Sequence, residues 1–507
     1  MNEQNNAFYQ QPYMPPQPIM PPQIAQRMRK SIYPKWVTQY GVAVYFLVLA
    51  IVTFIYSSYS MPWYYLLSGA VAVMVFFMYS TTVINDTSIN RIRREKAFEK
   101  RIFIIAFVPR ILWMFLIYFI FMENYGDAFG FENADAFFYN ELGTDFADTM
   151  SDGTFIKKWR NLLAGGMDLS DMGYAAYVGF VYMLTGKSIV AVRLLKCIWS
   201  SITVVLVYRL AKRCFGEQIG RMAAVFCALW PNFWYYCGCH LKETEMVFLS
   251  VLFVEQADQM LRSRQFTAWK VIPVLLIAAS LLTVRTPLAL VAFLSLLFSI
   301  TMTSERVVNW GKRIIVGGLA ILLIVVTMGN SIIEESRGLV DTVQSGEQQQ
   351  NMEWRTQRAN GNAFAKYAGK SVFAPLIFTI PFASMVRPFD GQEQQQLLNG
   401  GNFVKNILSF FTIIAMVTLL MSGKWRDYLL PLSFMLGYIV VLTMSTFAQS
   451  ERFHQPAMPF EFMFAAYGLS IAVTNKKYKR WFTYWCALMF VACIAWNWFK
   501  MAGRGLT

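Results

Sequence analysis

Long apolar runs, almost free of charge, recur along the whole chain. Examples are Gly41 to Ile55, Val271 to Leu282 and Ile314 to Met328. A membrane span needs about 20 largely apolar residues, and backbone groups surrounded by lipid must bond within their own segment. The runs lack the period-two alternation of a β-barrel strand. The pattern therefore predicts an all-α fold, a polytopic transmembrane helical bundle.

We predict about thirteen spans, with boundaries uncertain by a few residues. They are placed at 36–58, 62–84, 102–122, 189–210, 222–238, 244–261, 270–284, 286–303, 313–331, 404–422, 429–447, 457–474 and 481–499. The spans 270–284 and 286–303 are short and meet near Arg285 and Pro287. An alternative interpretation is that the two together are one bent unit. The apolar stretch 372–386 has only 15 residues and two prolines, and we expect it to be re-entrant or interfacial rather than a span.

The basic residues indicate the orientation. They gather in short loops, such as 85–101 and 475–480, which fall on one side of the predicted membrane. Cytoplasmic loops carry an excess of Lys and Arg. This predicts a cytoplasmic N-terminus and two long loops on the outer side, at about 123–188 and 332–403.

The same pattern divides the chain into regions. The first 26 residues are rich in Gln, Pro and Asn, cannot bury a core and lack the features of a signal peptide. We predict a disordered cytoplasmic tail at 1–35, a transmembrane hairpin with a basic cytoplasmic loop at 36–101, a transmembrane core at 102–331 that includes the outer loop 123–188, a second outer loop at 332–403, and C-terminal transmembrane helices at 404–507.

Composition agrees with a membrane protein. Charged residues make up 15% of the chain and hydrophobic residues 56%, whereas soluble domains carry about 25% charged residues. The net charge of +15 follows from the basic loops, so we expect no nucleic-acid partner. Cys237, Cys239 and His240 form a CxCH string, but with only two histidines in the chain a metal site there lacks further ligands.

The first outer loop holds the clearest candidate chemistry. Between Glu123 and Asp152 it has eight carboxylates and no Lys or Arg, interleaved with aromatic residues. If the segment 131–143 is helical, Asp135 and Tyr139 lie one turn apart on one face. A carboxylate there can accept a proton from a nucleophile or hold a metal ion. The alternative is an acidic, solvated loop without a function.

Further along the chain, charged residues stand at the edges of spans. Arg193 opens one span near the outer surface, Lys242 and Glu243 lie at a later outer turn, and Arg285 separates two short apolar runs. Such charges are costly unless they are paired or functional. An anionic ligand at the membrane surface would need a cation of this kind. The structural alternatives are a surface ion pair for Lys242 and Glu243, and a snorkelling arginine at position 285.

Six short motifs follow one another in an order that resembles a known family. They are DAxxY (Asp135 to Tyr139), RLL (Arg193 to Leu195), YRLAKRCFG (Tyr208 to Gly216), WP…LKE (Trp230 to Glu243), VRTP (Val284 to Pro287) and ERFHQPAMP (Glu451 to Pro459). The chain resembles the GT-C membrane glycosyltransferases, the fold of the protein mannosyltransferase and aminoarabinose transferase families. The resemblance covers about residues 100–300, and 440–475 loosely.

The resemblance implies a function. Such enzymes move a sugar, with inversion, from a polyprenyl-phosphate donor to a glycan, lipid or protein acceptor at the outer face of the membrane. An Asp of the first outer loop serves as the general base. That role falls on Asp135, with Tyr139 in support.

The resemblance also assigns the binding residues. Lys242, Arg285 and Arg452 match basic positions that would hold the donor phosphate, and Arg193 and Glu243 are further substrate-binding candidates. The loop motif of the family is often an acidic pair, but here Ala136 follows Asp135, so Glu132 is the candidate for the second carboxylate.

The resemblance also bears on the cofactor and on the location of the protein, but without assigning residues. A divalent cation is the candidate cofactor, although no metal ligands are assigned. The protein would be a multi-pass protein of the bacterial inner membrane, in contact with membrane lipids.

Three other functions remain open at this point. An O-antigen-type polymerase or ligase also has many spans and a long outer loop, although that loop usually comes late, as 332–403 does here. A lipid-linked glycan transporter would be expected to show repeated halves with broken helices, and we find no such self-similarity. A non-catalytic scaffold is the third.

Overall fold

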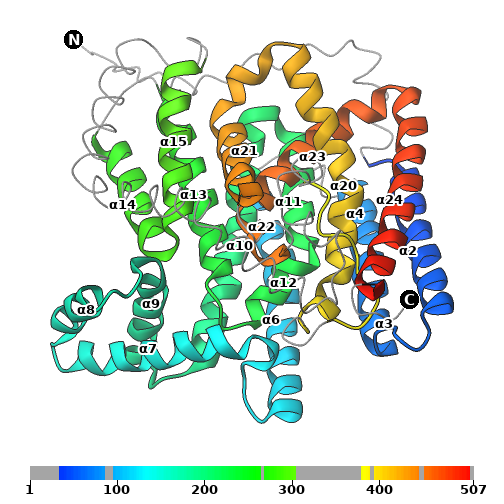
Figure 1. Cartoon of the computed structure of the whole chain (residues 1–507). Coiled ribbons are helices and arrows are strands. Elements are labelled where there is room, and N and C mark those ends of the chain that lie inside the picture. The colour runs from blue at the N-terminus through cyan, green and yellow to red at the C-terminus, as the bar shows by residue number, and fades with distance from the viewer. Residues whose placement is uncertain are drawn as a thin grey trace, which may run out of the picture.

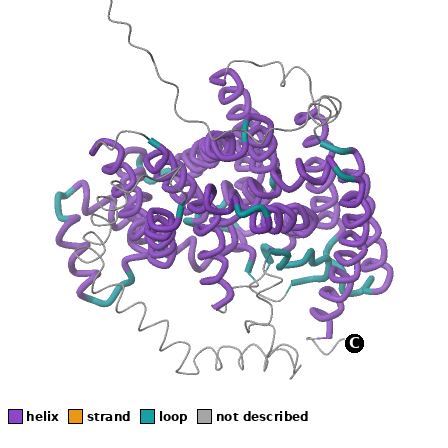
Figure 2. The backbone as a smooth tube through the Cα atoms, turned by 90° about the horizontal axis from the view of Figure 1, so that it is seen from above, coloured by secondary structure: helices purple, strands orange, loops and turns teal. Residues whose placement is uncertain are grey.

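The structure is a computed structural model that describes residues 33–85, 95–263, 268–303, 378–388, 393–444 and 450–502. Within these ranges the regular elements are helices and none is a strand, which confirms the all-α prediction (Figures 1 and 2). The longer helices are α2 (Lys35–Ile55), α3 (Trp63–Met74), α6 (Glu95–Tyr125), α10 (Ile189–Phe215), α11 (Glu217–Leu229), α13 (Glu243–Arg262), α14 (Ala268–Val284), α15 (Thr286–Met302), α20 (Gln395–Met421), α21 (Leu429–Met444), α23 (Met458–Thr474) and α24 (Lys476–Ala502).

Eight helical segments in the described ranges are long and apolar enough to cross a membrane. They run over 35–55, 63–85, 95–125, 189–215, 395–421, 424–443, 451–474 and 476–501. Each coincides with a predicted span, so the multi-pass architecture is supported, whereas the count of about thirteen is not confirmed. The predicted span 313–331 lies outside the described residues.

The other four predicted spans differ from a simple apolar helix for visible reasons. The predicted span 222–238 is split between α11 and α12 (Pro231–Gly238), because Pro231 starts a new helix after Trp230. α14 and α15 are apolar but only 17 residues each, and they are separated at Arg285 as expected.

The remaining one, α13, spans 20 residues but carries several charged side chains. These charges are buried and paired within the bundle: Lys196 with Glu245, and Arg213 with both Glu255 and Asp258. A charge in a membrane protein is tolerated when it faces the bundle interior and has a partner. The predicted span 244–261 is therefore present as an interior helix whose charges are paired with other helices of the bundle.

Helix α20 carries a polar face through the middle of the bundle. Its buried polar residues recur every three or four positions: Gln396, Asn399, Asn402, Lys405, Asn406, Ser409 and Thr412. Several of these side chains form hydrogen bonds with other helices. The Tyr45 hydroxyl on α2 donates to Asn399, and the Asn232 amide on α12 donates to Asn402. Interhelical hydrogen bonds of this kind specify which helices pack together in a membrane.

The apolar stretch 372–386, predicted to be re-entrant or interfacial, is described only from residue 378, and the segment 378–388 is not helical. It runs as extended backbone, and Asn497 on α24 accepts from the amides of Met385 and Val386 and donates to the Ala383 carbonyl. Asn406 and Lys405 on α20 satisfy further carbonyls of the segment. Irregular backbone at membrane depth is stable only when protein groups satisfy it.

The predicted first outer loop is folded into helices. After the turn η2 (Gly130–Glu132) come α7 (Asn133–Ser151), α8 (Phe155–Ala164) and α9 (Leu169–Thr185). Figure 1 shows α7 lying crosswise to the bundle helices, at the end where α6 terminates. α7 packs closely on α9, with Gly143 against Val178 and Gly179 against Phe146, where a larger side chain would collide.

Candidate active site

Helix α7 presents Asp135 and Tyr139 on neighbouring turns but in different surroundings. Asp135 lies in the first turn, and its side chain is 52% exposed. Tyr139 is buried against Tyr174 of α9, with the two rings in an edge-to-face contact at 5.0 Å. The aromatic residues of the loop therefore form a small core of their own, and this core holds the carboxylate of Asp135 at the surface.

Arg452 joins the first long loop, at 123–188, to the C-terminal part of the chain. Its Nη1 lies 2.6 Å from Oδ2 of Asp135, and its Nε donates to Oε1 of Glu243. Arg452 belongs to the four-residue helix α22 (Glu451–His454), and Glu243 begins α13. Three residues that are far apart in the sequence thus form one ion-pair group.

A second ion pair lies next to the first. Nζ of Lys242 is 2.6 Å from Oδ1 of Asp171 on α9 and 2.9 Å from the Ser170 carbonyl oxygen. The Tyr139 hydroxyl donates to the same Asp171 oxygen at 3.0 Å, and the Lys242 ammonium lies 5.5 Å from the centre of the Tyr139 ring. Because Lys242 and Glu243 are adjacent, the two ion-pair groups share one turn of the chain.

The surroundings of Asp171 determine its charge state. Burial acts to raise the pKa of Asp171, but the hydrogen bonds from Lys242 and Tyr139 outweigh it, so the pKa of Asp171 is lowered. Burial, together with the charge of Asp171, raises the pKa of Tyr139. Tyr139 is therefore a neutral donor that holds Asp171 as an anion, and Asp135 is the carboxylate open to a reactant.

Arg285 supplies a third cation at the same place. It precedes α15, and its guanidinium lies 5.3 Å from the centre of the Phe453 ring, while that of Arg452 lies 5.9 Å from the same ring. The charge of Arg285 also acts on Lys242 and Asp171. Among the described residues Arg285 has no carboxylate within ion-pair distance, so it is the cation of the three that is available to an anionic ligand.

The structure thus brings together six of the eight residues singled out in the sequence: Asp135, Tyr139, Lys242, Glu243, Arg285 and Arg452. Glu132 ends the turn before α7, and its side chain lies outside the described residues.

Arg193 lies elsewhere: it is fully buried, donates to the Ala128 carbonyl and sits 5.7 Å from the centre of the Tyr118 ring. From that position it supports the loop that leads to α7.

Sequence analysis missed Asp171. The acid stands in the first turn of α9, behind the capping residue Asp168, where a carboxylate is common for helix-dipole reasons alone. Nothing in the spacing distinguishes it from the other acids of the loop. Its partner Lys242 is 71 positions away, so only the tertiary structure reveals the pair.

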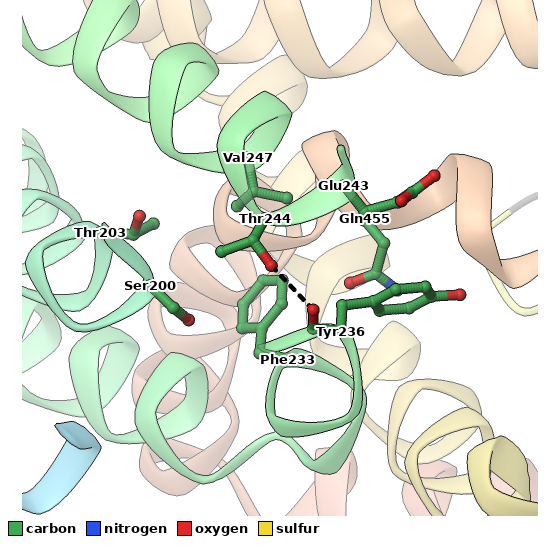
Figure 3. A pocket seen from close by; sticks show the side chains of 8 residues that line it. All are labelled: Ser200, Thr203, Phe233, Tyr236, Glu243, Thr244, Val247 and Gln455. Carbon is green, nitrogen blue, oxygen red and sulfur yellow. Dashed lines mark hydrogen bonds between the residues drawn. The ribbon is translucent and has the colours of Figure 1, made fainter. Parts of the chain in front are cut away.

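A small cavity lies behind Glu243, between α10, α12 and α13. Figure 3 shows Glu243 and Gln455 side by side above Tyr236, with the Thr244 hydroxyl bonded to the Tyr236 carbonyl at 3.3 Å. The cavity volume of about 10 Å³ is room for one water molecule. Oε2 of Glu243 and Oε1 of Gln455 have no donor in the structure, so a water here would meet two acceptors.

The described residues contain no group of three or more His, Cys, Asp or Glu side chains arranged to hold a metal ion. Cys237 and Cys239 are buried and form no disulfide, and His240 is packed among the rings of Phe129, Tyr174 and Tyr182. The CxCH string is therefore not gathered into a ligand set.

Comparison with known proteins identifies one segment of the chain. Residues 172–329 match the family model described as dolichyl-phosphate-mannose-protein mannosyltransferase. The match includes Arg193, Lys242, Glu243 and Arg285 and leaves out Asp135 and Arg452. No curated protein and no solved structure matches the chain. The family match supports the resemblance over residues 172–329, where four of the six motifs lie: this segment is similar to a family of the GT-C superfamily of membrane glycosyltransferases.

Proposed function

We propose that this protein transfers a sugar from a polyprenyl-phosphate donor to a glycan, lipid or protein acceptor at the outer face of the membrane. The observation that carries the proposal is the convergence of three cations, Lys242, Arg285 and Arg452, beside the exposed carboxylate of Asp135. A lipid-linked phosphate needs cations at the membrane surface, and the acceptor needs a base. Both requirements are met within one cluster.

The proposed reaction is a direct displacement at the anomeric carbon. The acceptor oxygen forms a bond to that carbon while the bond to the phosphate oxygen breaks, and the electron pair leaves with the polyprenyl phosphate. Asp135 takes the acceptor's proton as the new bond forms. Attack opposite to the leaving phosphate inverts the configuration at the sugar.

Arg285 and Arg452 have different roles at the donor phosphate, because they have different ion-pair partners in the protein. Arg285, without a carboxylate partner among the described residues, is the primary phosphate ligand. Arg452 is bound to Glu243 as well as to Asp135, so it can turn one N–H toward the phosphate and still keep an ion pair. Asp135 is then released to act as a base only when the donor is in place. A divalent cation remains a candidate cofactor, with no step assigned to it.

Sugar transfer is tested directly with purified protein in liposomes. We expect radiolabel from at least one polyprenyl-phosphate sugar to appear in an acceptor fraction taken from the native membrane. A panel of donors with different sugars identifies the substrate. Movement of an intact labelled donor across the bilayer, with no bond broken, would instead indicate the transporter. Joining of whole glycan chains from a diphosphate-linked donor would indicate the polymerase or ligase.

Orientation in the membrane is tested separately. Thr154 precedes α8 in the outer loop, and Asn475 lies between α23 and α24 in a predicted cytoplasmic loop; both are exposed. We expect Thr154→Cys to react with an impermeant thiol reagent in intact cells, and Asn475→Cys to react only after permeabilisation. The seven native cysteines are buried and should give a low background. Labelling of Asn475→Cys but not Thr154→Cys in intact cells would reverse the orientation and contradict an outer-face reaction.

A further inference from the structure

The short helix α22 carries Arg452 and cannot be stable by itself. It has four residues and is followed by the turn η6 (Gln455–Ala457) before α23 begins. A single helical turn is unstable in an isolated peptide in water, because forming it fixes the backbone dihedral angles of several residues and gains only one hydrogen bond. The position of Arg452 must therefore be determined by contacts of its neighbours.

The two residues on either side of Arg452, Glu451 and Phe453, are held by hydrogen bonds to the interior of the bundle. Glu451 accepts from the Tyr236 hydroxyl at 3.0 Å and from the amide of Gln455. The Phe453 carbonyl accepts from the Tyr438 hydroxyl at 2.9 Å. Arg452, the remaining residue between these anchors, reaches toward Asp135 and Glu243.

His454 is held by a lysine inside the bundle. Nδ1 of His454 lies 2.9 Å from Nζ of Lys405 on α20, and both side chains are buried. Lys405 also donates to the Ile380 carbonyl of the extended segment at 2.7 Å. A lysine buried within a membrane-spanning helix is costly and typically has a function. Neither Lys405 nor His454 belongs to the residues proposed to bind the donor phosphate or to take the acceptor's proton.

We propose that Lys405 and His454 are positioning residues for sugar transfer: their contact fixes α22 so that Arg452 faces the donor phosphate and Asp135. This inference rests on the proposed function, since it assigns Arg452 a role at the donor. The ammonium of Lys405 donates to the imidazole, which requires the tautomer with its proton on Nε2. The lysine thereby links α22 to both α20 and the extended segment.

The primary test is His454→Leu, with His454→Asn as the conservative variant. Asn places an acceptor close to the position of Nδ1, whereas Leu removes it. Loss of precise geometry at a reacting site costs about 100-fold. We expect His454→Leu to raise the donor KM and lower kcat/KM by about 10- to 100-fold. His454→Asn should recover most of that loss.

Two further measurements separate positioning from simple destabilisation. Asn497→Leu is the matched control, because Asn497 anchors the same extended segment at Ala383 and Met385 but makes no hydrogen bond to α22 among the described residues. It should leave the donor KM unchanged even if the melting temperature falls. In an Arg452→Gln background, His454→Leu should raise the donor KM no further. An equal effect of His454→Leu with and without Arg452, or an equal KM increase in Asn497→Leu, overturns the proposal.

A donor-independent measurement distinguishes failure of this inference from failure of the proposed function. Hydrogen exchange of the backbone amides in residues 451–457 should accelerate in His454→Leu and not in Asn497→Leu. If no donor is consumed by the wild type, the proposed function fails while this exchange result still tests the anchor. Unchanged exchange in His454→Leu would show that Lys405 does not hold α22.

Discussion

Asp135→Asn is expected to lower the rate of sugar transfer by about 100- to 10,000-fold, the usual cost of losing a general base. Asn keeps the shape of the side chain and an oxygen that can accept from Arg452, so α7 and α22 should stay in contact. Donor binding should survive, because Arg285 and Lys242 do not depend on Asp135. The measurements are single-turnover transfer from a labelled donor and, in parallel, the donor dissociation constant.

The controls for this prediction come from the same loop. Asp148→Asn changes an acid on α7 that is 59% exposed and paired with Lys187, away from the cations. Asp127 accepts from the amides of Phe129 and Gly130 and holds the turn before α7, so Asp127→Asn should affect folding more than the chemical step. Glu132→Gln tests the second candidate carboxylate. Wild-type turnover by Asp135→Asn with a dead Glu132→Gln would move the base to Glu132, and full activity of all four would leave the loop without a catalytic role.

Arg285→Gln is expected to weaken donor binding by about 1.5 to 3 kcal/mol, or about 10- to 150-fold, with little change in thermal stability. The reason is the asymmetry among the three cations. Arg452 and Lys242 neutralise carboxylates of the protein itself, so their loss leaves charges unpaired, whereas Arg285 has no such partner among the described residues. The measurement is the binding of polyprenyl phosphate in detergent, together with the melting temperature.

Two variants sharpen the test of Arg285. Arg285→Lys restores the charge without the planar, two-pronged geometry, so partial recovery is expected. Arg160→Gln removes an exposed arginine of α8 outside the cluster and should bind the donor normally. Wild-type affinity in Arg285→Gln would exclude Arg285 as the phosphate ligand and shift that role to Lys242 or Arg452.

The helices could be predicted from the sequence because lipid restricts the backbone so strongly. Long apolar runs must become helices, and all eight candidate spans in the described residues coincide with predicted ones. In the interior of the bundle the same rule was less accurate. The predicted span 244–261 does form a helix, α13, although its charges are paired, whereas α12 begins at Pro231 where a continuous span was predicted. Hydropathy measures transfer into lipid, and these helices are surrounded largely by protein.

The candidate site was predictable only in its parts. The motifs identified Asp135, Lys242, Glu243, Arg285 and Arg452 one at a time. Charged residues next to apolar runs are easy to recognise in a sequence, because a charge near lipid is costly unless it is paired or functional. Which charges pair could not be predicted. Asp135 and Arg452 are 317 positions apart, and the buried residues that contact α22, such as Lys405, appear as ordinary polar residues in the sequence.

The sequence by itself determined that this chain is a multi-pass helical membrane protein with a segment similar to the GT-C glycosyltransferases, since apolar run length and local motifs are properties of the chain alone. Only the tertiary structure decided that Asp171 pairs with Lys242, that Arg193 lies beneath the loop rather than in the cluster, and that Arg285 has no carboxylate within ion-pair distance among the described residues. The physical reason is that the state of a charge depends on its distance to other charges and to water. Those distances are set by packing between helices that are remote in sequence.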